Sequence, residues 1–150
     1  MKVRSFGADR TLVVVAVVAL ASCHSWGFYR PVDMPPKLEQ VSPGGVRWED
    51  LHVGEGAEAL AGSRVSVHYT GRLESGAQFD SSRDRGAPFA FVVGRGKVIS
   101  GWDEGMLGMR VGGTRRIVVP PQRAYGAKGR AGVIPPNATL VLEIELLSVE

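Results

Sequence analysis

The chain has one cysteine and three histidines among its 150 residues, and this scarcity excludes several classes of protein. A single cysteine cannot form an internal disulfide, so a disulfide-stabilised scaffold and a cysteine-based metal site are both excluded. The histidines, His24, His52 and His68, include no pair at the spacing of metal ligands, which argues against catalytic zinc. We therefore expect no metal and no other cofactor.

The chain also lacks a long hydrophobic run. Its longest apolar stretch, around residues 12–20, is about half as long as a membrane-spanning helix needs to be. An apolar fraction of 44% and a charged fraction of 22% are typical of a soluble globular protein. This length is that of about one domain, so we expect one folded domain and not a disordered, collagen-like or polytopic membrane chain.

The apolar stretch has the surroundings of a targeting signal. A segment with three basic residues and one acid precedes it, and small residues follow it. This arrangement predicts a secretory signal peptide over residues 1–22; an uncleaved anchor or a buried core strand is the alternative. Removal of the segment lowers the formal charge from +3 to +1. Nucleic-acid binding then has little electrostatic support, and we expect no nucleic acid partner.

The end of this stretch, Leu20-Ala21-Ser22-Cys23, resembles the lipobox of bacterial lipoproteins. In that family the cysteine sulfur carries a diacylglycerol, and the new amino terminus is often acylated as well. Two or three acyl chains anchor a protein stably where one does not, and lipidation accounts for a lone exported thiol. We predict a lipid anchor on Cys23 that binds the protein to the bacterial envelope. By the same resemblance, His24 in place of aspartate predicts the outer membrane if the cell is Gram-negative.

Residues 23–44, from the lipidated cysteine onward, are predicted to be a tether. The segment is rich in proline and shows no apolar periodicity, which is typical of an extended, polyproline-like linker. It is too short and too proline-rich for a dimerising helix, so we expect a monomer. Its aromatic residues Trp26, Phe28 and Tyr29 either lie at the lipid interface or belong to an unordered linker.

Residues 45–150 show the periodicities of strands and one helix. An apolar residue at every second position over 65–70 is the period of a half-buried strand. Further strand patterns occur at 89–91, 115–119 and 140–147. Over 98–109 the apolar residues follow the 3.6-residue period of a helix, although three glycines lower its propensity. We expect an α+β fold, with a curved sheet and a short helix on its concave face.

The aromatic residues of this region, together with a glycine-rich loop, form either a hydrophobic core with a hairpin or a binding pocket. Six short segments decide between the two readings. They are Val67-His-Tyr-Thr-Gly-Arg-Leu73, Phe79-Asp-Ser-Ser-Arg83, Pro88-Phe-Ala-Phe91, Val98-Ile-Ser-Gly-Trp102, Ala124-Tyr-Gly126 and Ile134-Pro-Pro-Asn-Ala-Thr-Leu140. In order and spacing they resemble the FKBP-type peptidyl-prolyl isomerases across residues 45–150.

The resemblance implies a bent antiparallel sheet of five or six strands wrapped around one short helix, with an aromatic-lined pocket for a proline ring. It also implies peptidyl-prolyl cis-trans isomerisation. Together with the predicted lipid anchor, this activity is expected to act on exported or envelope proteins. Rotation about an X–Pro bond faces a barrier of about 18–20 kcal/mol because the planar amide is stabilised by resonance. Charge separation falls at the twisted state, so an apolar, water-poor cavity favours that state. No nucleophile, metal or general base is needed.

By resemblance, Trp102 is the floor of the pocket, unless it is simply a core tryptophan. The hydroxyl of Tyr125 is expected to donate a hydrogen bond to the carbonyl before the proline. The backbone N–H of Ile99 is expected to donate to another carbonyl of the substrate. Asp80 is expected to organise the wall through Arg85 and the hydroxyl of a neighbouring tyrosine; a surface salt bridge is the alternative. The resemblance thus implies three catalytic residues, Tyr125, Asp80 and Trp102. The substrate-binding residues it implies are Tyr69, Phe79, Arg85, Phe89, Val98, Ile99, Ile134 and Leu142.

Two positions depart from the family. Leu142 stands where well-known members carry a phenylalanine, so we expect a larger pocket and modestly weakened binding of tacrolimus-type macrolides. Arg130 stands where a histidine is common, and it either alters which peptides dock or is a solvated loop tip. His68 alternates away from the pocket side of its strand.

Two other functions compete with an isomerase. One is a non-catalytic module that holds proline-bearing partners or acts as a chaperone, and the other is a structural envelope lipoprotein. The complete aromatic walls favour catalysis. A dedicated chaperone usually carries a large apolar insert in the loop that here spans residues 125–134, and this loop is short.

Overall fold

The computed structural model describes residues 39–150, so the predicted signal peptide, Cys23 and most of the tether lie outside the described residues. In chain order the elements are β1 (Gln40–Val41), β2 (Arg47–His52), β3 (Arg64–Leu73), β4 (Gln78–Ser81), β5 (Phe89–Val92), α1 (Ser100–Met106), β6 (Thr114–Val119), the 3₁₀ turn η1 (Pro121–Arg123) and β7 (Leu140–Val149). In this part of the chain no helix is long and apolar enough to cross a membrane.

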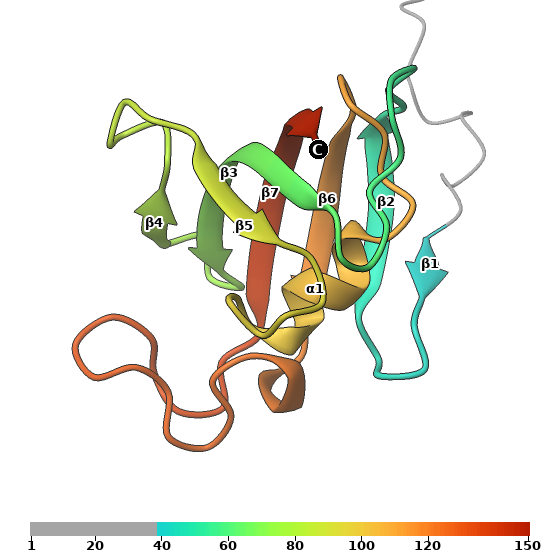
Figure 1. The fold of residues 1–150 in the computed structure, drawn as a ribbon. Coiled ribbons are helices and arrows are strands. Elements are labelled where there is room, and N and C mark those ends of the chain that lie inside the picture. Colours follow the sequence, from blue (N-terminus) through green and yellow to red (C-terminus); the bar gives the residue numbers. More distant parts are fainter. Residues whose placement is uncertain (1–38) are drawn as a thin grey trace, which may run out of the picture. The chain divides into compact units, whose positions relative to one another are not determined.

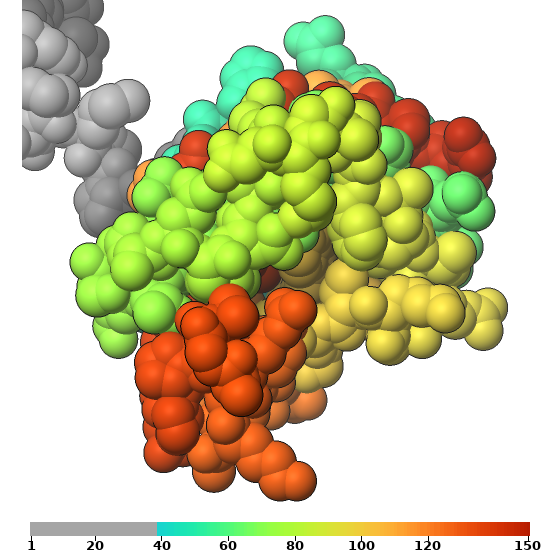
Figure 2. All heavy atoms as spheres, turned by 90° about the vertical axis from the view of Figure 1, so that its left-hand side faces the viewer, coloured from blue at the N-terminus to red at the C-terminus, as the bar shows by residue number. Residues whose placement is uncertain are grey.

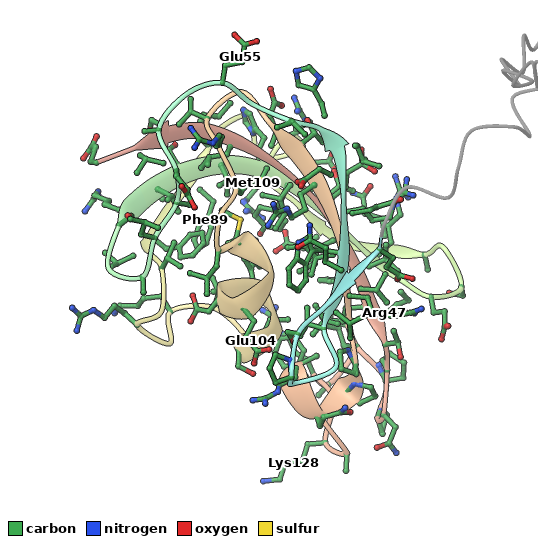
Figure 3. All side chains as sticks on the ribbon, turned by 90° about the vertical axis from the view of Figure 1, so that its right-hand side faces the viewer. Arg47, Glu55, Phe89, Glu104, Met109 and Lys128 are labelled. Atoms are coloured by element: carbon green, nitrogen blue, oxygen red, sulfur yellow. The ribbon has the colours of Figure 1, made fainter. Side chains whose placement is uncertain are left out.

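The strands described form one antiparallel sheet. Their order is β1-β2-β6-β7-β3-β4, and β5 pairs with β3 off this path. The sheet curves around α1 (Figures 1 and 3). The predicted α+β class is confirmed. The sheet has seven strands where five or six were expected, and the edge strand β1 is only two residues long.

The two longest strands, β3 and β7, have the predicted alternation of buried and less buried residues. They pair over almost their whole length, so their inward side chains form the centre of the core. The patterns of β5 and β6 were also recognised in the sequence. The strands β2 and β4 were missed because their residues are mostly charged or polar and half-buried, and only their partner strands identify them.

The helix α1 is shorter than the segment 98–109 that its periodicity indicated. It ends at Met106, and Gly108 takes a positive φ of 77° that a continuing helix does not allow. Two of its glycines face β6. A Cβ at Gly101 would lie 2.2 Å from a methyl of Val119, and one at Gly105 would lie 2.6 Å from Ile117. These glycines lower the helix propensity, but they permit the close approach of helix and sheet.

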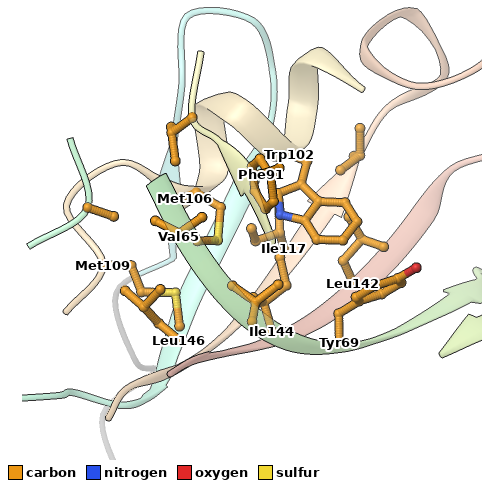
Figure 4. Packing of buried hydrophobic residues seen from close by; sticks show 14 of the residues in the cluster. Val65, Tyr69, Phe91, Trp102, Met106, Met109, Ile117, Leu142, Ile144 and Leu146 are labelled. Carbon is orange, nitrogen blue, oxygen red and sulfur yellow. The ribbon is translucent and has the colours of Figure 1, made fainter. Parts of the chain in front are cut away.

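The core fills the space between α1 and the sheet. Figure 4 shows it running from Met109 and Leu146 at one end to Trp102 and Tyr69 at the other. Trp102 and Tyr69 are each only 6% exposed. These two rings therefore close this end of the core.

The folded part begins before the predicted boundary at Gly45. Gln40 and Val41 pair with β2, and the Ser42 hydroxyl donates to Glu104 of α1 at 2.7 Å. Gly45 takes a φ of 80° in the turn of this hairpin, where glycine is the residue without a steric penalty. The short, exposed strand before this turn has no pattern of its own in the sequence. Residues 40–44, which were assigned to the tether, are therefore part of the described fold.

One buried cation joins the helix to two strands. Arg115 of β6, whose side chain is 5% exposed, donates to both carboxylate oxygens of Asp50 on β2 at 2.7 and 3.1 Å. It also donates to the backbone carbonyls of Gly105 and Leu107 at 2.8 and 2.9 Å. Carbonyls at a helix C-terminus have no partner within the helix, so Arg115 caps α1 and holds it to the sheet.

We expect Arg115→Leu to lower the free energy of unfolding by about 3 kcal/mol, because it leaves Asp50 and two carbonyls without their donor. Arg116→Leu removes the same charge from the next residue, whose side chain is 44% exposed and pairs with Glu49. That control should cost less than about 1 kcal/mol. Urea unfolding of both variants measures the difference, and equal losses would refute the capping role.

Candidate functional site

A cavity of about 450 Å³ opens at the end of the core that holds Trp102. In Figure 2 the surface is hollowed where the yellow-green, yellow and orange segments meet. Ten of the eleven pocket residues named from the sequence line this cavity. They are Tyr69, Phe79, Asp80, Arg85, Phe89, Val98, Ile99, Trp102, Tyr125 and Leu142. The fold brings them together from four strands (β3, β4, β5 and β7), three connecting segments and one helix.

Aromatic rings form the apolar floor and walls. Trp102 on α1 packs edge-on against Tyr69 of β3, with ring centroids 4.7 Å apart, and against Phe91 of β5, with centroids 5.6 Å apart. Phe89 stands 6.0 Å from Tyr69 and 6.1 Å from Trp102. Such aromatic pairs stabilise a cluster beyond the burial of its rings, so the rings support one another in this arrangement.

Three polar side chains form a closed network in the wall. The Tyr69 hydroxyl donates to Asp80 at 2.6 Å, and Arg85 donates to the same hydroxyl at 2.9 Å and to the other carboxylate oxygen of Asp80. The guanidinium of Arg85 also lies over the Tyr69 ring, 5.5 Å from its centroid. The Asp80 contacts expected from the sequence are present, and the carboxylate charge is neutralised inside the network.

The network shifts the pKa values of its members. Burial alone raises the pKa of Asp80, but the hydrogen bonds from Tyr69 and Arg85 and the charge of Arg85 outweigh it, so the pKa lies below the ordinary 3.8. Burial and the bond to Asp80 raise the pKa of Tyr69 above 10.0. Asp80 is therefore ionised and Tyr69 protonated at neutral pH.

Two donors at the cavity have no acceptor within residues 39–150. The backbone N–H of Ile99, just before α1, donates to no protein group there, and neither does the hydroxyl of Tyr125. Tyr125 is 37% exposed and lies on the loop that precedes β7. The cavity thus combines an apolar floor with two donors that are free for an occupant.

Ile134 is the predicted pocket residue that does not line this cavity. It is 3% exposed and belongs to the core, and its backbone exchanges two hydrogen bonds of 2.8 Å with Arg130. These bonds close the 124–136 loop and fix the side chain inward. Ile134 therefore shapes the loop that carries Tyr125 instead of contacting an occupant of the cavity.

The cavity has three further lining residues, Lys97, Arg130 and Leu140. Leu140 lies two residues before Leu142 on β7, so the alternation of that strand could have identified it. Arg130 was singled out only as a departure from the family pattern. Lys97 directly precedes Val98, and nothing in the sequence pattern marks it. Within residues 39–150 no cluster of three or more metal-ligating side chains is present.

Comparison with known proteins identifies the family. Residues 56–147 match the family model of the FKBP-type peptidyl-prolyl cis-trans isomerases. The chain belongs to this family. It is 54% identical to an FK506-binding protein of Neisseria meningitidis serogroup B over 106 residues, which cover 71% of this chain and 97% of the relative. It is also 54% identical to the peptidyl-prolyl cis-trans isomerase Fkbp12 of Drosophila melanogaster, over 59% of this chain and 82% of the relative.

Solved structures support the same family assignment. A peptidyl-prolyl cis-trans isomerase from Pseudomonas syringae superposes with a TM-score of 0.69 at 37% identity, covering 77% of this chain and 83% of the other. The activity predicted from the sequence, peptidyl-prolyl cis-trans isomerisation, is therefore confirmed at the level of the family. Its members bind proline-containing substrates and macrolides.

The lowered pKa of Asp80 predicts how its contribution to stability depends on pH. An ionised group with a depressed pKa stabilises the fold above its unfolded pKa and loses that effect as the pH falls through the folded pKa. Asp80→Asn should lower the free energy of unfolding by about 1 kcal/mol at pH 7. The difference from the wild type should stay constant down to about pH 5 and shrink below the ordinary value of 3.8.

Chemical denaturation at several pH values measures this difference. Asp84→Asn, in the turn that follows β4 and outside the cavity, is the control, because Asp84 is exposed and bonds only to Gln78. A penalty for Asp80→Asn that persists undiminished at pH 2.5 would contradict the assigned charge state.

Proposed function

We propose that this isomerase acts on exported proteins at the bacterial envelope, attached to the membrane by a lipid on Cys23, and that the described cavity receives the proline ring. The observation that carries the assignment of the cavity is the pair of free donors beside a rigid aromatic floor. The observation that carries the location is the lipobox-like sequence at residues 20–23.

In this proposal the proline ring packs on the indole of Trp102, between the rings of Tyr69 and Phe89. The planar amide of the X–Pro bond is polar because of resonance, and the twisted transition state is less so. A cavity that excludes water therefore stabilises the twisted state relative to the planar one. Lowering the barrier by about 4–7 kcal/mol corresponds to an acceleration of about 10³–10⁵-fold.

The two free donors orient the substrate. The Tyr125 hydroxyl donates to the carbonyl that precedes the proline, and the Ile99 N–H donates to a second carbonyl of the peptide. Asp80 and Arg85 hold the Tyr69 ring in place and leave no uncompensated charge in that wall. Asp80 is thus mainly a positioning residue of the network.

The back of the cavity is aliphatic. Leu140 and Leu142 line it and are 0% and 1% exposed. A leucine is smaller than the phenylalanine of well-known members, so we propose that activity is retained and that tacrolimus-type macrolides bind modestly more weakly. We also propose that the protein acts as a monomer.

The cavity assignment predicts the rates of three variants. Trp102→Ala should lower kcat/KM for a proline tetrapeptide about 100-fold, because burying a large ring contributes about 2–3 kcal/mol. Tyr125→Phe should lower it about threefold to tenfold through one lost hydrogen bond, and Asp80→Ala by a similar factor through a displaced Tyr69. The measurement is cis-to-trans conversion catalysed by the purified protein.

Val133→Ala is the control, because Val133 is exposed on the same loop as Tyr125 and does not line the cavity. Circular dichroism confirms that each variant is folded. A folded wild type that accelerates no proline peptide would reject the catalytic role and leave a proline-binding module. Normal activity in folded Trp102→Ala would reject the assigned floor.

The envelope assignment predicts that lipidation depends on Cys23. Expressed as the full chain in a Gram-negative bacterium, the wild type should incorporate labelled palmitate and sediment with the outer membrane. Cys23→Ala should lose the label, whereas Ser22→Ala, which keeps a small residue before the cysteine, should retain it. His24→Asp should keep the label and move to the inner membrane. Palmitate in Cys23→Ala, or an unlabelled wild type, would overturn the proposal.

A further inference from the structure

The cavity is lined by more positively charged side chains than negatively charged ones. Asp80 is the only carboxylate that lines it, and Arg85 neutralises Asp80 within the polar network. Two more cations, Lys97 and Arg130, also line the cavity. Neither of them has a carboxylate within salt-bridge distance among residues 39–150. The rim of the cavity therefore carries two uncompensated positive charges.

The two cations come from different segments. Lys97 lies just before α1, and Arg130 lies on the 124–136 loop; both are exposed. In Figure 2 these yellow and orange segments border the hollow on adjacent sides. A peptide whose proline enters the cavity must cross this rim on its way in or out. Its neighbouring residues then pass close to Lys97, Arg130 or both.

The acid closest to Lys97 along the chain forms no ion pair with either cation among residues 39–150. Asp103 in the first turn of α1 does not line the cavity. Its carboxylate accepts hydrogen bonds from the backbone N–H groups of Gly94 and Gly96 at 2.9 and 3.4 Å. That carboxylate is thus engaged in shaping the segment that precedes Lys97.

We propose that Lys97 and Arg130 bias substrate choice by charge, so that the enzyme favours an acidic over a basic residue next to the proline. This inference rests on the proposed placement of the proline in the cavity. Exposed unit charges several ångströms apart interact weakly in water, and salt screens them. The preference is therefore a modest, salt-dependent factor in kcat/KM and not an absolute requirement.

The test uses peptides that differ only in the residue before proline, which is Glu, Gln or Lys, and a second set that varies the residue after it. In a protease-free assay at about 20 mM ionic strength, we expect kcat/KM for the better Glu peptide to exceed that of its Lys counterpart about fivefold. At about 0.5 M salt the ratio should fall below about twofold.

Variants with reversed charge provide the second part of the test. Lys97→Glu or Arg130→Glu alone should reduce the Glu-to-Lys ratio, and the double variant should invert it. The matched control is Lys128→Glu, which makes the same change in net charge on the 124–136 loop. Lys128 does not line the cavity and projects from the end of the loop, away from the body of the protein (Figure 3). Its variant should keep the wild-type ratio.

The outcomes separate this inference from the proposed function. Acceleration of the Gln peptides with a Glu-to-Lys ratio near one in both sets would overturn the specificity inference and leave the isomerase intact. A preference for the Lys peptides, or a ratio equally changed by Lys128→Glu, would overturn it as well. No acceleration of any peptide would instead reject the proposed function.

Discussion

The close contact between α1 and β6 is the constraint on which the rest of this structure depends. A helix of seven residues is too short to be stable by itself, so its position must come from packing. Gly101 and Gly105 allow its backbone to approach the side chains of Val119 and Ile117, and Arg115 binds the carbonyls at its C-terminus. Since Trp102 lies between the two glycines, this contact also fixes the floor of the cavity.

The cavity is therefore formed by residues of the hydrophobic core and not by a separate structural element. The same rings that seal the end of the core, Trp102 and Tyr69, form the surface on which the proline is proposed to pack. The proposed mechanism needs an apolar surface of this kind and no group that changes its charge. The Tyr69–Asp80–Arg85 network fits this requirement, because it introduces polar groups into the wall while pairing every charge it contains.

The residues at the rim of the cavity are less constrained by packing than those at its floor. Floor residues are buried and held by many neighbours, so their identities are tightly constrained by packing. Lys97 and Arg130 are exposed at the edge, where a change of charge costs the fold little. In the proposed binding mode, the floor receives the proline ring and the rim cations act only on neighbouring residues, so the charge of the rim can change without a change in the floor.

Some secondary-structure elements could be predicted from the sequence and others could not. The strands β3, β5, β6 and β7 and the helix were predicted because each has a buried face with a regular period. The strands β1, β2 and β4 were not, because they are short or mostly polar and have no regularly buried face. Ten pocket residues came from the family resemblance, whereas Lys97 and Leu140 became apparent only from the cavity.

The sequence by itself determined the fold class, the family and the aromatic set, because these are carried by local periodicity and by motifs whose order is visible in one dimension. It also contains the lipobox-like segment, which lies outside the described residues. Only the tertiary structure decided that Ile134 turns into the core, that the glycines of α1 serve close packing, and that two cations share one rim. Each of these depends on contacts between segments far apart in the chain, which no local pattern encodes.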